Sequence, residues 1–391
     1  MKGSFIVVQL VFLFTSINAQ VAWPAKEWPV STPASEKMIA DSLKSFDDDI
    51  SSGIYGYVDG MFVTRNGKLV YQKAWKHDYN KAYGEDAKTT SAMNPYDPGG
   101  QYNYFNPWWH PFYRNAGELH SLQSVTKTMT SVIIGVAVNR NEFPDISTPV
   151  LSFFDTTQVK NIDDRKRRMT IKHLLTMTAG FNWNENLPYS DPANDGTIME
   201  ASFDWVQYVI NRPMAYEPGQ TFAYNSGASQ LLSYIFRKAT GKDIEEYAVQ
   251  HLFAPLGIND YFWKRTPTGL ADTEGGLYLK PSDLAKVFYL FLQNGNWNGK
   301  QIVSNDWARS SVSGAVTLDG ERKYGYKWWL YEYGPGKFAW YGSGFGGQWP
   351  IVIPEYNIVA VFTAWNVLPG RPSLGRTVII RRLLNAIADK K

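Results

Sequence analysis

The sequence predicts an α+β fold in which an antiparallel sheet is flanked by helices and interrupted by an inserted, mainly helical domain. Strand patterns occur near both ends of the chain, in MFVTR and KLVYQKAW at the beginning and in KFAWYGSGFGG, QWPIVIPEYN and IVAVFTAW towards the end. Between these ends the apolar residues recur at helical spacing. Because strands from the two ends most simply join one sheet, we expect the sheet part at about residues 36–76 and 270–388, and the helical part at about 120–269.

The individual elements follow from local signals. Asn66-Gly67 separates the two N-terminal strands and favours the positive φ angles of a tight hairpin turn. Ser35 is expected to cap a first helix that runs to Ile50. Further helices are expected in the apolar run at residues 122–138, at 171–177, 197–210, 229–240, 244–253 and 282–293, and in a closing amphipathic segment at 376–388.

Residues 77–119 form a long segment without helical or strand periodicity. The segment contains Gly99-Gly100 and many aromatic residues, among them Trp108 and Phe112. Loops of this length in compact domains are usually functional or disordered, and the many aromatic side chains argue against disorder. This aromatic loop either walls a binding cleft or packs over the core.

The first residues have the pattern of an export signal. Lys2 precedes an apolar stretch from Phe5 to Phe14 that is too short to span a bilayer, and the small residue Ala19 ends it ahead of a polar segment. Residues 1–19 are therefore expected to be a secretory signal peptide, so that a mature domain at 20–388 is periplasmic or secreted. The alternative is a short membrane anchor. No later segment predicts stable membrane insertion of the mature chain.

The composition excludes several classes of function. With 39 Lys+Arg and 36 Asp+Glu, the net charge of +3 argues against a nucleic-acid binder held by bulk charge. The absence of cysteine excludes disulfides, zinc–thiolate sites, iron–sulfur clusters and a cysteine nucleophile. The five histidines show no recognisable ligand spacing, so we expect neither a metal nor another cofactor.

Ser124-Val125-Thr126-Lys127 is an S-x-x-K motif at the start of the expected helix 122–138. Residues three apart lie on one helical face, and a helix start offers N–H groups to a developing oxyanion. Apolar neighbours should lower the pKa of Lys127, and a neutral amine can act as a base towards the Ser124 hydroxyl. The motif by itself is weak, since an ordinary first helical turn also fits it.

Two further segments carry chemistry. Tyr224 lies in FAYNSG, on a loop between expected helices. A phenol beside a lysine can relay a proton, but the chain has 24 tyrosines, and a single tyrosine is more often a packing residue. The segment Gly342 to Gly347 formally contains the dinucleotide pattern G-x-G-x-x-G. That pattern needs a following helix, whereas QWPIVI predicts a strand, so we reject nucleotide binding. Glycines beside a strand instead let a ligand approach backbone N–H groups.

Together these motifs resemble those of serine β-lactamases and penicillin-binding proteins, which carry S-x-x-K, a Tyr- or Ser-led triplet and a Lys-Thr-Gly-like triplet on a strand. The chain looks like the class C β-lactamase-related branch, with its esterases, D-alanyl carboxypeptidases and 6-aminohexanoate-dimer hydrolases. Phrases such as LHSLQSVTKTMTS, IKHLLTMTAGF and YEPGQTFAYNSGASQLLS are similar too, over about residues 36–388. The resemblance implies a β-lactamase/transpeptidase-like fold.

The resemblance also implies a role for each motif. Ser124 would be the nucleophile, with Lys127 and Tyr224 as its proton-transfer partners. The N–H groups of Ser124 and Phe345 would form the oxyanion hole. The residues implied to contact substrate are Ser226, Gly342, Ser343 and Gly344.

Two departures from the family pattern bear on the substrate. Ser226 stands where the family usually has Asn, and Gly342 where a Lys or His often stands. Loss of the cation weakens the case for a substrate carboxylate, such as that of a penicillin or a peptidoglycan stem. The segment from Gly344 to Gln348 is closer to that of the esterase and aminohexanoate-oligomer hydrolase relatives.

The sequence therefore predicts an exported serine hydrolase that cleaves an amide or ester bond of a small molecule or short peptide through an acyl-enzyme on Ser124. The alternatives are an enzyme that processes D-alanyl peptides or β-lactams, and a non-catalytic relative that binds the cell wall. Nothing in the sequence indicates the oligomeric state.

Overall fold

The computed structural model describes residues 22–24, 26–83, 112, 118–189, 191–368 and 370–390. The predicted signal peptide at 1–19 and most of the predicted aromatic loop at 77–119 lie outside these residues. In chain order the elements are α1 (Ala40–Ser51), β1 (Val58–Arg65), β2 (Lys68–Ala74), α2 (Tyr79–Ala82), β3 (His120–Ser121), α4 (Val125–Asn139), η3 (Val150–Phe153), η4 (Thr156–Gln158), α5 (Asp164–Arg168), α6 (Ile171–Leu175), α7 (Asp195–Ala201), α8 (Trp205–Ile210), α9 (Ser226–Thr240), α10 (Ile244–Ala248), η5 (Val249–Phe253), α11 (Ala254–Leu256), β4 (Phe262–Trp263), β5 (Leu277–Leu279), α12 (Pro281–Leu292), β6 (Asn296–Trp297), β7 (Lys300–Gln301), α13 (Asn305–Ser311), β8 (Val316–Thr317), β9 (Arg322–Tyr324), β10 (Trp329–Gly334), β11 (Lys337–Tyr341), β12 (Trp349–Ile353), η6 (Pro354–Tyr356), β13 (Ile358–Ala364) and α14 (Arg376–Asn385).

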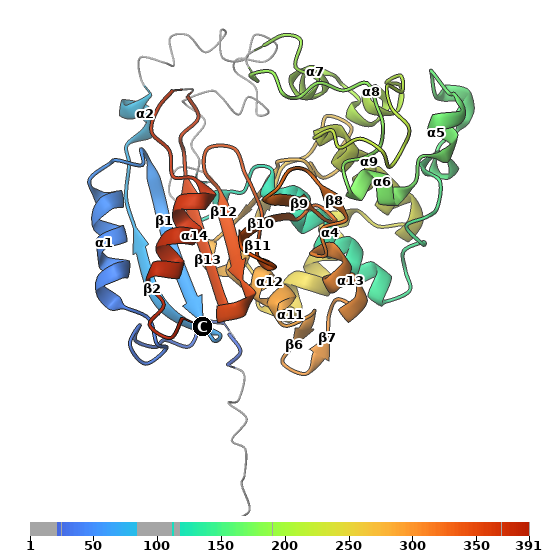
Figure 1. The fold of residues 1–391 in the computed structure, drawn as a ribbon. Coiled ribbons are helices and arrows are strands. Elements are labelled where there is room, and N and C mark those ends of the chain that lie inside the picture. Colours follow the sequence, from blue (N-terminus) through green and yellow to red (C-terminus); the bar gives the residue numbers. More distant parts are fainter. Residues whose placement is uncertain are drawn as a thin grey trace, which may run out of the picture.

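The main sheet has eight antiparallel strands in the order β2-β1-β13-β12-β11-β10-β9-β8 (Figure 1). The N-terminal strand β1 pairs with the C-terminal strand β13, for example through Met61 and Phe362. The two ends of the chain thus build one sheet, which confirms the predicted fold class. Helices and short strands between β2 and β8 form the inserted part.

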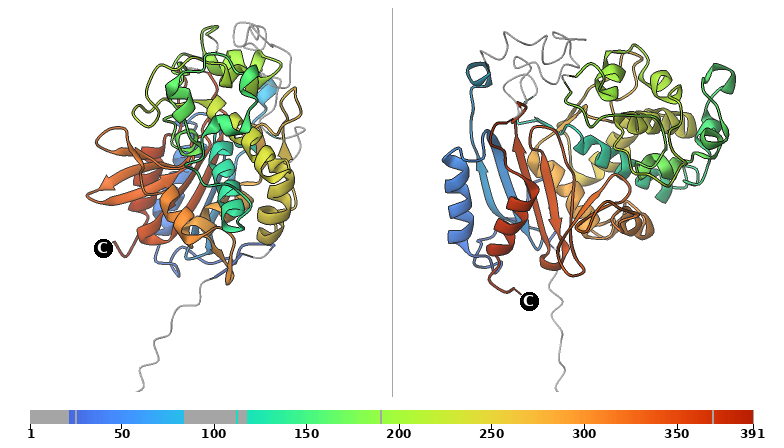
Figure 2. Two further views of the ribbon diagram at one scale, coloured as in Figure 1. Left: turned by 90° about the vertical axis from the view of Figure 1, so that its right-hand side faces the viewer. Right: turned by 45° about the horizontal axis from the view of Figure 1, so that its top comes forward.

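Both faces of the sheet are covered. Along β13, Ile358, Ala360 and Phe362 belong to a core cluster shared with α1 and α14, whereas Val359 and Val361 belong to the cluster shared with the helical part. Alternate residues of a strand point to opposite faces, so a doubly covered strand is apolar along its whole length. The three views show α1 and α14 against one face and the helices from α4 to α13 beyond the opposite face, while α2 lies at one end of the sheet (Figures 1 and 2).

The N-terminal elements bear out one local prediction and correct another. Asn66 and Gly67 take φ angles of 55° and 75°, as the hairpin between β1 and β2 requires. The predicted cap at Ser35 is wrong, because α1 begins at Ala40 after a turn in which Lys37 has a φ of 55°. That turn is closed by the N–H of Met38, which donates to the carbonyl of residue 33 (2.7 Å).

The helical part is more broken than its periodicity predicted. The expected helix at 197–210 is two helices, α7 and α8, because the Asp204 side chain caps α8 by accepting from the N–H of Gln207 (2.9 Å). The expected helix at 171–177 ends at Leu175, and Met177 has a φ of 58°. The inserted part also contains a small antiparallel sheet in the order β3-β5-β4. Among the described residues, no helix combines the length and apolar character that crossing a bilayer requires.

Candidate active site

Ser124 lies at the start of α4, directly after a short strand. β3 pairs with β5, and the N–H of Leu122 continues this pairing by donating to the carbonyl of Leu277 (2.9 Å). Gln123 then takes a φ of 48°, an uncommon angle for a residue other than glycine, and Ser124 enters the helical region at a φ of −61°. The Ser124 hydroxyl makes no capping bond to the helix, so its oxygen is left for side chains of the site.

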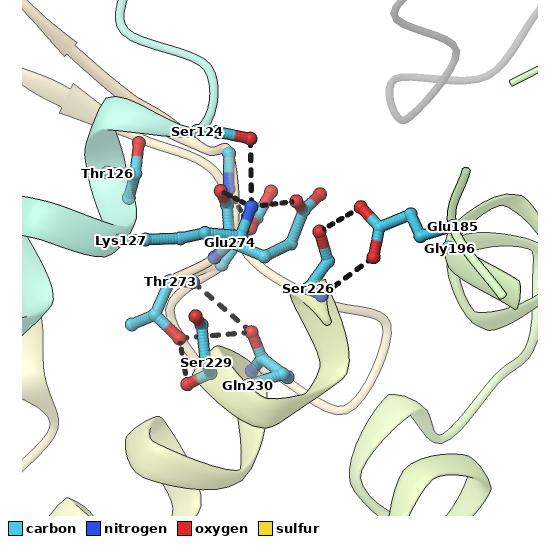
Figure 3. A network of polar contacts seen from close by, with 12 residues as sticks. Ser124, Thr126, Lys127, Glu185, Gly196, Ser226, Ser229, Gln230, Thr273 and Glu274 are labelled. Carbon is cyan, nitrogen blue, oxygen red and sulfur yellow. Dashed lines mark hydrogen bonds and ion pairs between the residues drawn. The ribbon is translucent and has the colours of Figure 1, made fainter. Parts of the chain in front are cut away.

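Helix α4 places Lys127 one turn beyond Ser124, as the spacing predicted. The Lys127 Nζ donates to Ser124 Oγ (2.9 Å), to the backbone oxygen of Glu274 (2.7 Å) and to Glu274 Oε2 (3.1 Å) (Figure 3). An ammonium group has three N–H donors, and these acceptors share them with the nearby phenol of Tyr224. Lys127 is 1% exposed and Glu274 is 5% exposed, so the pair is almost out of contact with solvent.

The structure contradicts the predicted lowering of the Lys127 pKa. Burial acts to lower this pKa, but the interactions with Tyr224, Glu274 and Glu185 outweigh burial and raise it. Lys127 is therefore a cation in the free protein. The prediction counted only the apolar neighbours along the helix, whereas the groups that raise the pKa are Tyr224, Glu274 and Glu185, all from segments distant in the sequence.

Tyr224 lies beside this pair, on the loop that leads into α9. The Lys127 Nζ is 5.3 Å from the centre of the Tyr224 ring, and this ring stacks on Trp329 of β10 (6.1 Å between centroids). The carbonyl of Met177 holds the loop by accepting from the N–H of Ala223 (2.9 Å). Burial raises the pKa of Tyr224, although the charge of Lys127 and hydrogen bonds with Ser124 and Lys127 oppose the rise.

Ser226 is engaged in a polar contact with the protein itself. Its hydroxyl donates to Glu185 Oε1 (2.6 Å) and its N–H to Glu185 Oε2 (2.8 Å), as Figure 3 shows. Glu185 also accepts from Trp183 Nε1 (2.9 Å) and from the hydroxyl of Tyr189 (3.0 Å). Asn225 caps α9 by accepting from the N–H of Ala228 (2.8 Å). The side chains of Asn225 and Ser226 therefore both have hydrogen-bond partners inside the protein.

The glycine segment lies beside the turn that leads to Ser124. Gly342 and Gly344 continue the ladder between β11 and β12, through their N–H bonds to the carbonyls of Pro350 and Gln348 (3.0 Å each). A Cβ at Gly344 would lie 2.4 Å from the carbonyl oxygen of Leu122. The close approach requires glycine here, and the strand that follows supports the rejection of a dinucleotide fingerprint.

Gln348 fixes the loop that carries Ser343 and Phe345. Its side-chain Nε2 donates to the carbonyls of Phe345 (3.2 Å) and Ala364 (2.5 Å), and Gln348 is 1% exposed. The Phe345 ring makes an edge contact with Tyr189 (5.6 Å). Ser343 is half-buried on this loop. The oxyanion role of the Ser124 and Phe345 N–H groups stays a prediction.

Sequence reasoning missed three carboxylates of the site. Glu274 pairs with Lys127, Glu185 holds Ser226, and Glu200 of α7 hydrogen-bonds to Glu274. Burial and the charge of Glu274 raise the pKa of Glu200 well above its usual range. None of the three stands at a fixed spacing from Ser124. Within the described ranges, no three His, Asp or Glu side chains gather in a way that could hold a metal ion.

Comparison with known proteins places this chain among relatives of β-lactamases. A model of the Beta-lactamase family matches residues 51–380. Monacolin J acid methylbutanoyltransferase of Aspergillus terreus is 28% identical over 155 residues, which are 37% of this chain and 37% of that protein. The 6-aminohexanoate-dimer hydrolase of Paenarthrobacter ureafaciens is 26% identical over 268 residues, which are 63% of this chain and 66% of that protein. The chain thus spans less than two thirds of the length of either relative.

Solved structures share the fold. The hydrolase EstCE1, described as having promiscuous acyltransferase activity, superposes with a TM-score of 0.63 at 13% identity, covering 91% of this chain and 100% of that chain. At this identity the match concerns the fold alone.

Proposed function

Because the chain belongs to the Beta-lactamase family, we propose that it is an exported serine hydrolase that cleaves an amide or ester bond through an acyl-enzyme on Ser124. The observation that carries the proposal is the contact between Lys127 Nζ and Ser124 Oγ (2.9 Å) at the start of a buried helix, with Tyr224 alongside. The fold, shared with a carboxylesterase, an amidohydrolase and a penicillin-binding protein, supports it. The substrate is a small molecule or a short peptide.

The proposed reaction has two steps. Ser124 Oγ attacks the substrate carbonyl carbon, its proton passes to the neighbouring side chains, and the carbonyl electron pair moves to the oxygen. The N–H groups of Ser124 and Phe345 stabilise this oxyanion, and one such donor is commonly worth about 3 kcal/mol of barrier. Tyr224 and Lys127 then return a proton to the departing amine or alkoxide. Water releases the acyl group and restores the Ser124 hydroxyl.

The residues around Ser124 favour a substrate that does not bind through a carboxylate of its own. Gly342 supplies no cation, and Lys127 is already paired with Glu274. Glu274 accepts from Lys127 and Glu185 accepts from Ser226, so neither group offers positive charge to a substrate carboxylate. A penicillin or a peptidoglycan stem, each with a carboxylate, fits this charge distribution poorly. An ester, or an amide such as an aminohexanoate dimer, fits better.

The hydrolase is tested by labelling and by turnover. We expect a fluorophosphonate to label the wild-type protein on Ser124, as located by mass spectrometry, and not to label Ser124→Ala. A panel of p-nitrophenyl esters, aminohexanoate dimers, nitrocefin and D-Ala-D-Ala peptides should show turnover of the first two. Preference for nitrocefin or D-Ala-D-Ala would favour the alternative enzymes. No labelling and no turnover, together with binding of peptidoglycan by Ser124→Ala, would favour a non-catalytic cell-wall protein.

Export is tested separately, because it rests on residues 1–19 alone. We expect the secreted or periplasmic fraction to contain a mature chain that begins near residue 20, as N-terminal sequencing would show. A chain that keeps residues 1–19 and sediments with membranes would support the short anchor instead.

A further inference from the structure

A continuous line of contacts runs from Ser124 through Lys127 to a buried carboxylate. Lys127 Nζ lies 2.9 Å from Ser124 Oγ on one side and 3.1 Å from Glu274 Oε2 on the other (Figure 3). The backbone oxygen of Glu274 accepts a third N–H of Lys127 (2.7 Å), so one residue holds the amine at two points. Lys127 therefore lies between the hydroxyl of Ser124 and the carboxylate of Glu274, and a proton could pass from one to the other through its amine.

The proposed acylation needs an acceptor for the Ser124 proton. Lys127 already carries its full complement of protons, and an ammonium nitrogen has no lone pair. Tyr224 retains its phenolic proton, since its pKa is raised by burial. Burial also acts to raise the pKa of Glu274, but the charge of Lys127 and the hydrogen bonds it receives lower it. Glu274 is thus the ionised acceptor in direct contact with Lys127.

We propose that Glu274 is a positioning residue that acts through Lys127, taking one ammonium proton while Lys127 takes the proton of Ser124. The inference rests on the proposed serine hydrolase. In the step, the bond from Ser124 Oγ to the carbonyl carbon forms and the O–H bond of Ser124 breaks. One N–H bond of Lys127 forms as another breaks, and an O–H bond forms on Glu274 Oε2. When the leaving group departs, its bond to the carbonyl carbon breaks and it takes a proton from Lys127, while Glu274 returns its proton to Lys127 and is ionised again.

Glu274 is itself held in place from several sides. Its backbone N–H donates to Asp272 Oδ1 (3.0 Å), and Glu200 of α7 hydrogen-bonds to its side chain. The titratable groups that interact with it are Lys127 of α4, Glu185 and Tyr189 of the loop before α7, Glu200 of α7 and Lys264 after β4, and Asp272 accepts from its backbone N–H. Tyr224 before α9 and the buried Lys327 before β10 interact with Lys127 instead, and burial together with the charge of Lys127 lowers the pKa of Lys327. Lys127 is the cation among these groups in direct contact with the Glu274 carboxylate.

A purely structural counter-ion would show the same contacts, so the test must follow the proton. With Glu274 ionised, the acceptor is present throughout the neutral range, and the wild-type acylation rate should be flat between about pH 6 and pH 9. In Glu274→Gln, the amide cannot take a proton, and removal of the negative charge lowers the pKa of Lys127. Acylation then depends on loss of the Lys127 proton to solvent, so its rate should rise with pH by up to about tenfold per unit.

The experiment measures the second-order rate of fluorophosphonate labelling, and kcat and KM for an active p-nitrophenyl ester, from pH 5 to pH 10. For Glu274→Gln we expect a loss of roughly 10²-fold at pH 7 that shrinks towards pH 10, in kcat more than in KM. Glu274→Asp, which keeps a carboxylate, should recover part of the flat profile. The matched control is Glu246→Gln, an exposed glutamate of α10, which should follow the wild type at every pH.

Two results would overturn the inference while leaving the hydrolase intact. One is a wild-type rate that itself rises tenfold per pH unit between pH 6 and pH 9, because that rise would show Lys127 acting without Glu274. The other is a Glu274→Gln profile parallel to the wild type. The wild-type profile decides the matter even where Glu274→Gln does not fold. Absence of any Ser124-dependent labelling in the wild type would instead remove the proposed function, and this inference with it.

Discussion

The two faces of the main sheet bury their side chains in different ways. On the face covered by α1 and α14, apolar residues pack together, as where the rings of Phe46 and Phe362 lie 5.5 Å apart. Beyond the other face, the helical part buries Lys127 and Glu274 along with its apolar core. Burial of charges costs free energy unless they are paired. The first region is held mainly by apolar packing, with Asp47 of α1 as a buried carboxylate that accepts from Ser51 and Tyr71. In the second region the buried pair has a cost in stability, and the proposed function gives that pair a use.

The largest expected effect is on kcat/KM, which should fall on substitution of one buried lysine and not of another. Lys127→Met should lower kcat/KM by about 10³-fold, because it removes the group that contacts Ser124 Oγ. Lys166 is the matched control, since it is equally buried and donates to three backbone carbonyls far from Ser124 in the sequence. Lys166→Met should destabilise the fold and leave kcat/KM per folded molecule unchanged. Equal losses of kcat/KM in both variants would contradict the distinction.

The apolar face is tested by Phe362→Ala. Removing this fully buried ring should lower the free energy of unfolding by about 3–5 kcal/mol, measured in urea, because a cavity remains in the core. The kcat/KM of the folded fraction should stay at the wild-type value. Phe203→Ala, at a side chain that is 75% exposed, provides the comparison and should change neither quantity. A large fall in kcat/KM with unchanged stability would refute the proposed division between the two faces.

A smaller effect is expected where the sheet meets the site. Gly344→Ala would place its Cβ 2.4 Å from the carbonyl oxygen of Leu122, so that the strand or the turn before Ser124 must shift. A displacement of about 1 Å at a reacting group can cost roughly 10²-fold in rate, and we expect a loss of that order in fluorophosphonate labelling. Gly320→Ala, whose Cβ would meet no atom within 4 Å, should label normally. Wild-type labelling of Gly344→Ala would show that this close approach does not matter.

The smallest effect concerns the pH dependence of stability. The folded protein raises the pKa of Glu200, so between about pH 4.5 and that pKa the folded state binds a proton that the unfolded state has lost. Stability from this group is present at low pH and is lost as the pH rises, at up to about 1.4 kcal/mol per unit. Glu200→Gln should remove this contribution and give a flatter curve of unfolding free energy against pH. Superimposable curves for the two proteins would contradict an elevated Glu200 pKa.

Local signals predicted much of the fold but not all of it. The hairpin at Asn66-Gly67 was predictable, because the preference for positive φ belongs to the two residues themselves. The helix start at Ser35 was not, because Glu36 accepts hydrogen bonds from Asn66 (2.9 Å) and Lys68 (2.8 Å) and ties the segment to that hairpin. Contacts between distant segments thus outweighed a local capping preference.

The same division holds within the candidate site. The approach of Lys127 to Ser124 follows from three-residue spacing on one helix, and the sequence alone determined it. Tyr224 was expected there only through the resemblance to a known family, whereas Glu274 and Glu185 were not expected at all. No periodic pattern links residues from separate loops.

The sequence by itself determined which segments form the sheet, which helix is buried and which serine has a lysine one turn away, because these properties depend on neighbours along the chain. Tertiary structure decided that Lys127 is charged and that Ser226 is turned to Glu185. Electrostatic energies depend on distance and burial in space. Residues 127 and 274 became partners only when the small sheet brought their segments together.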